Sequence, residues 1–452
     1  MKKVLLIISF LWHILISNAQ PSANNKIISG PMLGQIELRT ASIWIEVDAA
    51  VKTIAIKYWE KDDPKTARVK IYKGSLGNEF NPVKMEIGGL DFNTTYQYNF
   101  LVDGTTANVS GTFTTKDLWQ WRKPAPDFSF LTGSCAYFNE PIFDRPGKPY
   151  GGDAAIFETM AKTPAAFMLW LGDNWYTREV DISSEWGLYY RASHDRRLPV
   201  LQHFWKAMPH YAIWDDHDYG PDDADGYYIL KDASRKLFMR YWNNPSYGQD
   251  DKGIFTKVSY SDVDIFLTDD RYFRSANNLA DSIDGKPNPD KHFLGAAQVE
   301  WLKNALVYSN ATFKIIAIGS QVLNPSHKEF ESMRHFSAEY NELMNFLDVQ
   351  KISGILFLSG DRHHSEVIKA ARIANYTLYD ITSSPLTSGI SKVRGDEINN
   401  PFRIPGTLVE EQNFSKITIT GKKGERKLTV EFIGLKGDKL SSWSIGEKEL
   451  QP

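Results

Sequence analysis

The sequence predicts an α/β protein with an all-β domain in front of its larger, layered part. Between residues 27 and 115, apolar and polar residues alternate with period two, and turn signals recur at short intervals. From about residue 126 onward, short apolar runs alternate with helical patterns, which is typical of strand–helix layering. Aromatic residues make up 13% of the 452 residues, which indicates packed cores rather than disorder.

The first 20 residues have the pattern of a secretory signal peptide. Two lysines precede an apolar run over residues 4–16, and Ser17-Asn18-Ala19 is a small-x-small cleavage site. We expect a signal peptide of residues 1–19 and a secreted or periplasmic protein with no stable membrane anchor. An uncleaved anchor is the alternative, but the run is short for a membrane span. The net charge of −3, without a Lys/Arg run, gives no sign of a nucleic-acid surface.

Residues 26–116 are predicted to form a sandwich of short strands. Asp103-Gly104 marks a hairpin within this region. The stretch 89–98 resembles the end of a fibronectin type III module, in which a leucine and tyrosines bracket the corner before the penultimate strand. The region shows no cluster of ionisable groups, so we favour a scaffold role over an independent binding role.

Residues 126–452 are predicted to form one α/β domain. Its apolar runs read as buried strands at 128–131, 167–171, 211–214, 263–267, 313–318 and 355–358. Helical patterns lie at 154–161, 296–308 and 338–347, and Asp153 is the predicted N-cap of the first. We expect the alternating segment 415–445 to form three strands that complete the sheet of this domain.

Four of the strand ends carry side chains that bind metals. These are Cys135; Asp173 and Tyr176; Asp215, Asp216 and His217; and Asp361, His363 and His364. Ligands in α/β sheets bind beyond the carboxyl ends of the strands, so we expect these side chains to gather. Mixed oxygen, nitrogen and sulfur donors suit a hydrolytic site with two cations, bridged by Asp173, that clamps an anionic ester. Polar side chains in unrelated loops are the alternative.

Cys135 is the only cysteine, so it cannot form an internal disulfide. It lies where the chain leaves a predicted strand rather than within the apolar run. Metal ligation would keep its thiol deprotonated and shielded. A small buried filler is the alternative role.

The order of the motifs resembles that of the PhoD-like alkaline phosphatases, within the calcineurin-like metallophosphatase superfamily. The motifs are Gly133-Ser134-Cys135, Gly172-Asp173-x-x-Tyr176, Trp214-Asp215-Asp216-His217-Asp218 and Ser359-Gly360-Asp361-Arg362-His363-His364. The resemblance covers about residues 27–445, because that family also carries an N-terminal β domain. It implies a four-layer αββα core and the hydrolysis of phosphoric esters by a metal-activated hydroxide.

The resemblance also implies roles for single residues. It implies metal ligation by Cys135, Asp173, Tyr176, Asp216, Asp361 and His363, and catalytic assistance by His217. The implied metals are Fe³⁺ and Ca²⁺, with Zn²⁺, Mn²⁺ and Mg²⁺ as alternatives. The fourth motif departs from the superfamily, because a histidine is replaced there by Gln321.

The remaining candidates are polar residues next to these motifs. They are Arg271 and His364 for catalysis, and Arg178, Asn174 and Gln321 for substrate binding. A guanidinium suits bidentate phosphate contacts, although a structural salt bridge is as good an interpretation of either arginine.

Three functions fit these observations. The first is a secreted phosphatase or phosphodiesterase. The second is an esterase that acts on another anionic ester, such as a sulfate. The third is a non-catalytic surface protein whose β domain binds glycan or protein. The presence of Asp173, Asp216 and His363 favours the enzymes.

Overall fold

The computed structural model describes residues 26–325, 331–372 and 375–452. The predicted signal peptide and its cleavage site lie outside the described residues. Among the helices of the described ranges, none is long and apolar enough to cross a membrane.

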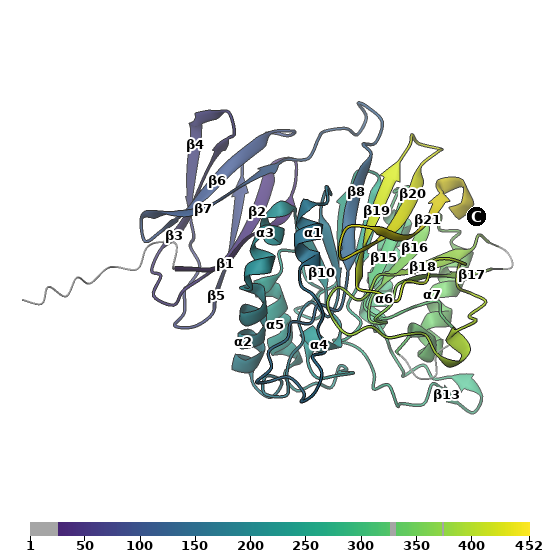
Figure 1. The fold of residues 1–452 in the computed structure, drawn as a ribbon. Helices are drawn as coiled ribbons and strands as arrows, with labels where there is room; N and C mark the ends of the chain where they lie inside the picture. The colour runs from purple at the N-terminus through teal and green to yellow at the C-terminus, as the bar shows by residue number, and fades with distance from the viewer. Residues whose placement is uncertain (1–25, 326–330, 373–374) are drawn as a thin grey trace, which may run out of the picture.

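The N-terminal part is a sandwich of two antiparallel sheets (Figure 1), with the strand orders β1-β2-β5 and β4-β3-β6-β7. The strands are β1 (Ile27–Ile36), β2 (Thr40–Val47), β3 (Ile54–Glu60), β4 (Asp63–Ile71), β5 (Asn81–Gly88), β6 (Thr95–Val102) and β7 (Thr105–Thr114). In β6, every second residue is buried between the sheets, among them Tyr96, Tyr98 and Phe100. The Tyr96 hydroxyl accepts a 3.0 Å hydrogen bond from the Asp91 amide and ties the corner before β6. The predicted all-β sandwich is confirmed.

The larger part contains two six-stranded mixed sheets, with the orders β10-β9-β8-β19-β20-β21 and β11-β12-β15-β16-β18-β17. The first comprises β8 (Phe128–Gly133), β9 (Met168–Leu171), β10 (His210–Ile213), β19 (Asn413–Thr420), β20 (Lys427–Gly434) and β21 (Lys439–Gly446). The second comprises β11 (Thr256–Tyr260), β12 (Val263–Leu267), β15 (Phe313–Ile318), β16 (Ile355–Ser359), β17 (Glu366–Ala370) and β18 (Leu378–Thr382). A small hairpin of β13 (Ser282–Ile283) and β14 (Lys286–Pro287) lies outside them.

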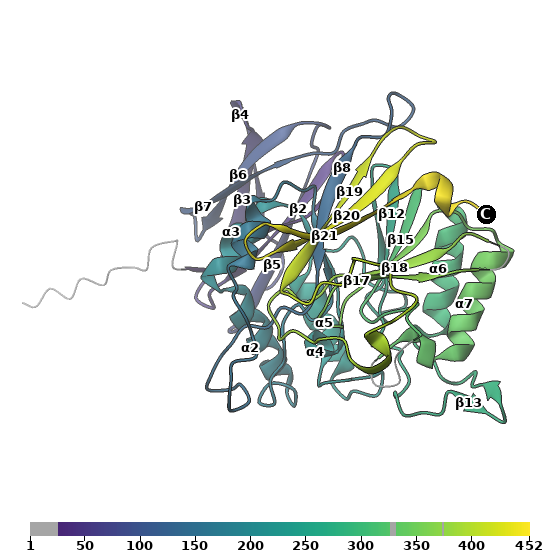
Figure 2. The same ribbon diagram turned by 45° about the vertical axis from the view of Figure 1, so that its right-hand side comes forward.

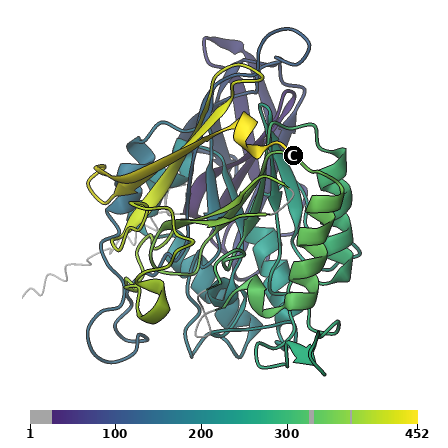
Figure 3. The same ribbon diagram turned by 90° about the vertical axis from the view of Figure 1, so that its right-hand side faces the viewer.

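Helices cover the outer faces of the two sheets. They are α1 (Ile156–Lys162), α2 (Glu185–Arg196), α3 (Pro199–Ala207), α4 (Asp216–Tyr219), α5 (Lys231–Tyr241), α6 (Ala296–Tyr308) and α7 (Ser337–Val349), with 3₁₀ turns at Met333–His335, Gly395–Glu397 and Glu447–Leu450. Figure 3 shows α6 and α7, in green, side by side along one flank. The four-layer arrangement predicted from the resemblance is confirmed.

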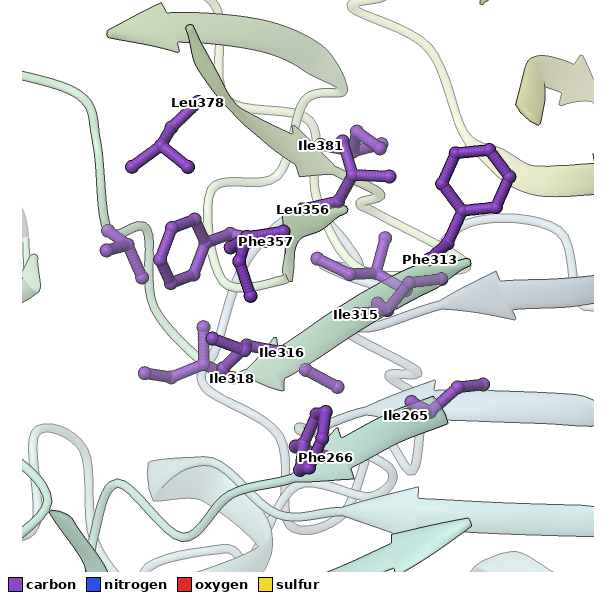
Figure 4. Close-up of a cluster of buried hydrophobic side chains, with 14 of the residues drawn as sticks. Ile265, Phe266, Phe313, Ile315, Ile316, Ile318, Leu356, Phe357, Leu378 and Ile381 are labelled. Atoms are coloured by element: carbon purple, nitrogen blue, oxygen red, sulfur yellow. The ribbon is translucent and has the colours of Figure 1, made fainter. Parts of the chain in front are cut away.

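The two-sided cover explains why the strands read as unbroken apolar runs. In β9, Met168 and Trp170 pack in one core with α1 and α3, whereas Leu169 and Leu171 pack in the core between the sheets. Figure 4 shows part of that second core, with side chains such as Ile315 from β15.

The three C-terminal strands extend the first sheet from β8 (Figure 2). Strand β19 pairs antiparallel with β8, and Ile417 lies opposite Phe130.

The predicted cap of α1 is wrong. The N-cap position belongs to Ala155, and the Asp153 side chain instead accepts a hydrogen bond from the Ala155 amide (2.9 Å) in the turn before the helix.

Candidate metal centre

The donor side chains lie just beyond the carboxyl ends of neighbouring strands. Strands β8, β9 and β10 are parallel and adjacent, and Gly133 pairs with Trp170 and Leu171 with Ile213 at their ends. The segments that carry Cys135 and Asp173 therefore leave the sheet side by side. The second sheet contributes the segment after β16 from the facing side.

Two glycines allow these strand ends to approach closely. A Cβ atom on Gly172 would lie 2.8 Å from the Asp215 amide nitrogen, and one on Gly360 would lie 2.8 Å from the Leu171 carbonyl oxygen. Both contacts are shorter than real Cβ atoms make, so the Gly-Asp pairs of two motifs have a steric reason.

Four of the site residues adopt a backbone conformation that L-residues rarely use. The φ angles are positive at Cys135 (62°), Asp173 (52°), Asp361 (66°) and His363 (55°). This conformation raises the free energy of each residue, and such strain is concentrated at functional sites.

The donor atoms of the described residues form two groups. Within each group, the atoms all lie within 4.8 Å of one another. One group contains Cys135, Asp173 and His363, and the other contains Asp173, Asp216 and His217. Asp173 belongs to both groups, as a carboxylate that bridges two cations would. The donors come from four separate strand ends, so the fold and not local sequence brings them together.

Hydrogen bonds hold the donors of the first group in place. The Tyr176 hydroxyl donates to Asp173 Oδ2 (2.9 Å) and lies 3.2 Å from His363 Nε2. Cys135 Sγ lies 3.5 Å from the same Asp173 oxygen and receives a hydrogen bond from the Ser384 hydroxyl (3.2 Å). Tyr176 thus contacts two of the three donors of the first group, Asp173 and His363.

The pKa values of the donors in this cluster indicate that a bound cation would stabilise their ionised forms. Burial, followed by the charge of Asp216, raises the pKa of Asp173 well above its usual value. Burial likewise raises the pKa of the Cys135 thiol to about 11 and, with the charge of Asp173, raises that of Tyr176. Crowded groups that lose protons reluctantly in the bare protein are stabilised as anions by a bound metal ion.

The donor chemistry fits metal binding at both groups. A thiolate and a phenolate beside an imidazole suit a transition metal, while the carboxylates suit a hard cation. Asp216 differs from Asp173, because the charges of His217 and Arg271 outweigh the effect of burial and hold its pKa at about 2. Asp216 is therefore ionised at neutral pH, as a metal ligand has to be.

Asp361 lies outside both donor groups. Burial, followed by the charge of Glu331, raises its pKa to about 7, and Asp216 adds to this shift. Asp361 is thus an electrostatic neighbour of the cluster.

Asp215 and Arg271 lie in a buried ion-pair cluster beside the metal site. Arg271 Nε donates to Asp215 Oδ1 (2.6 Å), and its two terminal nitrogens reach both carboxylate oxygens of Glu331. The Arg271 side chain has no solvent exposure. Of the two adjacent aspartates, only Asp216 lies in a donor group.

Arg178 and Asn174 hold the loops around the site. Arg178 pairs with Asp144 (2.9 Å) and donates to the carbonyls of Tyr176 and Phe138. The Asn174 side-chain amide donates to the Ile213 carbonyl (2.8 Å) and to the Asp218 carboxylate in α4. Both side chains are buried.

His364 and Gln321 lie in a separate buried polar network. His364 Nε2 is 3.5 Å from Glu366, and the Gln321 amide donates to the same carboxylate (2.8 Å). Arg362 donates to the Gln321 oxygen (2.7 Å). The structure therefore places neither residue in the donor groups of the metal centre.

Two residues that sequence reasoning did not select also reach the site. Tyr150 places its hydroxyl 3.0 Å from His363 Nδ1, and Asp222 places a carboxylate oxygen 3.4 Å from His217 Nε2. Tyr150 lies in a Pro- and Gly-rich loop with no periodic pattern, so the sequence carried no signal for it. Asp222 stands in the acidic stretch Asp222-Asp223-Ala224-Asp225, a composition that is also typical of a solvated loop, and its side chain is largely exposed.

Comparisons with known proteins agree with this fold. The family model of the PhoD-like phosphatases matches residues 130–431. A search of the curated proteins gives no match. A solved structure described as that of PhoD superposes with a TM-score of 0.75 at 17% identity, covering 95% of this chain and 92% of that one. The purple acid phosphatase PPD1 from yellow lupin seeds superposes with a TM-score of 0.65 at 10% identity, covering 92% and 74%. The chain belongs to the PhoD-like phosphatase family of phosphoric ester hydrolases.

Proposed function

We propose that this protein is a secreted metal-dependent hydrolase that prefers phosphodiesters over phosphomonoesters. The observation that carries the proposal is the pair of donor groups that share Asp173. A shared carboxylate between two sets of donors is the arrangement of a two-metal hydrolytic site.

We assign the metals from the chemistry of the donors. Cys135, Tyr176 and His363 would hold Fe³⁺ together with Asp173, because thiolate and phenolate ligands suit that ion. Asp173 and Asp216 would hold Ca²⁺, with Asp361 nearby. When bound, the metal pair supplies the positive charge that orients the phosphoryl oxygens and lowers the pKa of the attacking water.

His217 is placed to hold a proton for the leaving oxygen. Its ring lies 4.1 Å from that of Tyr176, between centroids, and its Nε2 is 3.9 Å from Asp216 Oδ2 and 3.4 Å from Asp222 Oδ1. Burial lowers the pKa of His217, while both carboxylates oppose that effect. The side chain is about a quarter exposed, at 23%, so a substrate can reach it.

The preference for diesters rests on the arginines. A phosphomonoester carries a second negative charge that extra cationic side chains would have to balance. Arg178 and Arg271, which we predicted to contact the phosphate, are both engaged in buried ion pairs, Arg178 with Asp144 and Arg271 with Asp215 and Glu331. A phosphodiester carries only one negative charge, so it needs fewer cationic side chains in the site.

The test is an assay of the metal-loaded protein on aryl phosphodiester, phosphomonoester and sulfate ester substrates, with elemental analysis of the same sample. We expect the largest kcat/KM on the diester, with iron and calcium bound. Hydrolysis of the sulfate ester alone would establish the related esterase instead. No hydrolysis by protein that holds both metals would favour a binding role.

Secretion rests on the residues before Gln20. We expect the exported protein to begin at Gln20, and N-terminal sequencing of protein from the culture medium or periplasm checks this. A protein that retains Met1 in the cytoplasm would contradict it.

A further inference from the structure

Tyr150 belongs to the loop between β8 and α1. Hydrogen bonds hold this loop next to the metal centre. The Asn139 side chain exchanges two hydrogen bonds with Gly151 (2.8 and 2.9 Å), and the Gly152 amide donates to the Thr387 carbonyl (2.6 Å). The Tyr150 ring also packs edge-to-face on Tyr137, with 4.9 Å between the centroids. Tyr150 is therefore held in place, although 45% of it is exposed.

The imidazole of His363 lies between two phenols. Its Nδ1 is 3.0 Å from the Tyr150 hydroxyl, and its Nε2 is 3.2 Å from the Tyr176 hydroxyl. Tyr176, whose hydroxyl donates to Asp173 of the first donor group, lies on the Nε2 side. Nε2 is thus the nitrogen that faces the metal centre, and Nδ1 faces away from it.

A neutral imidazole carries one proton, and the nitrogen that binds a metal must be the other one. If Nε2 offers its lone pair to the metal, Nδ1 must carry the proton and donate it. The Tyr150 oxygen is placed to accept that hydrogen bond. Metal-binding histidines are generally oriented by such an acceptor on their second nitrogen.

We propose that Tyr150 is the positioning residue for His363: its hydroxyl accepts the Nδ1 hydrogen and fixes the ring with Nε2 toward the metal. This inference rests on the proposed metal-dependent function and adds the β8–α1 loop to the site. The Gly389 backbone also interacts with the His363 ring, so removal of the Tyr150 hydroxyl weakens the orientation without abolishing it.

The packing of Tyr150 supplies an independent way to move it. A Cβ atom on Gly389 would lie 2.7 Å from Cε2 of the Tyr150 ring. The φ angle of Gly389 is not in the left-handed region, so the backbone accepts alanine there. Gly389→Ala would displace the ring from its present position without removing a polar group.

The experiment compares metal-loaded wild type with Tyr150→Phe and Gly389→Ala. Each protein is transferred into excess EDTA, and the release of metal is followed by elemental analysis and by the visible absorbance. We expect both variants to lose metal about tenfold faster than wild type. The matched control is Tyr227→Phe, which removes a hydroxyl from a tyrosine that is 85% exposed and should leave the release unchanged.

The double variant gives the sharper result. Gly389→Ala keeps the backbone groups of residue 389, so both changes act through the hydrogen bond of Tyr150, and the double variant should release metal no faster than the worse single variant. Release from Tyr150→Phe at the wild-type rate, with wild-type circular dichroism, overturns this inference and leaves the proposed function intact. Wild-type protein that binds no metal overturns both.

Discussion

The metal centre and the surroundings of Arg196 both contain buried ionisable side chains. The two regions differ in how the charges of these side chains are compensated. Arg196, at the end of α2, lies between the sandwich and the α/β domain. Its guanidinium carbon is 4.0 Å from the ring centroid of Trp242, 4.8 Å from that of Trp205 and 5.0 Å from that of Trp44. Burial lowers its pKa only to about 9, so it stays charged at neutral pH.

Around Arg196 the protein provides its own compensation. Trp44 and Glu46 come from β2 of the sandwich, and the Glu46 carboxylate accepts a hydrogen bond from Tyr241 (2.8 Å). Aromatic faces and one carboxylate stabilise one cation. At the metal centre, by contrast, Asp173, Cys135 and Tyr176 are all anionic when ionised, and burial raises the pKa of each. A buried charge that is already compensated indicates stability, whereas crowded donors of one sign indicate a ligand.

The largest effect that this comparison predicts comes from Asp173→Asn. The amide cannot bridge two cations, so the variant should lose metal and activity together. We expect kcat/KM on an aryl phosphodiester to fall by about a thousandfold or more, the equivalent of several kcal/mol. The measurement pairs kinetics with elemental analysis. Full activity in Asp173→Asn would show that the shared carboxylate is not the centre of the site.

His217→Ala separates catalysis from metal binding within the same site. The geometry places His217 in a donor group, whereas the resemblance assigns it to proton transfer. We expect kcat to fall by about a hundredfold while both metals are retained. Loss of one metal from this variant would instead make His217 a ligand, and an unchanged kcat would remove it from catalysis.

Arg196→Met tests the other side of the comparison. We expect the free energy of unfolding to fall by about 2 kcal/mol, since a desolvated cation among aromatic rings is lost. Metal content and kcat should not change. Arg68→Met, which removes a cation near the Tyr58 ring at the sandwich surface (5.0 Å), is the control and should cost less than half as much. A loss of metal in Arg196→Met would break the proposed separation of the two regions.

The smallest effect concerns pH. In the metal-free protein, burial and neighbouring carboxylates raise the pKa of Asp361 to about 7 and also raise that of Asp173 well above its usual value. The folded state therefore holds protons that the unfolded state releases near pH 4, so the stability of the metal-free protein falls as the pH rises from about 4 to 7. Bound metal displaces those protons. The melting temperature difference between loaded and metal-free protein should widen by a few degrees over this range, and a constant difference would contradict the assignment.

Much of the fold could be predicted from the sequence because its cores are regular. Period two in the sandwich follows from sheets with one buried face, as in β6. The unbroken apolar runs of β9 and β16 follow from sheets covered on both faces. The segments between the runs were sufficient to locate α6 at its observed bounds, Ala296–Tyr308. Exact caps depended on local turn geometry, which misled the prediction for Asp153.

The candidate site could be predicted in part, for a topological reason. Parallel strands end at one edge of a sheet, so donors such as Cys135 and Asp173 meet wherever those strands pair. Contacts made by loops could not be predicted. The Arg271 partner Glu331 lies 60 residues further along the chain, and Tyr150 lies 213 residues before His363. Neither separation leaves a pattern in the sequence.

Metal removal and return tests the central claim most directly. The purified protein is assayed on an aryl phosphodiester before chelation, after exhaustive dialysis against EDTA, and after Fe³⁺ and Ca²⁺ are added back, with metal content measured at each stage. The account predicts that hydrolysis disappears with the metals and returns with them, in proportion to occupancy. Undiminished hydrolysis by protein in which elemental analysis finds no metal would contradict it.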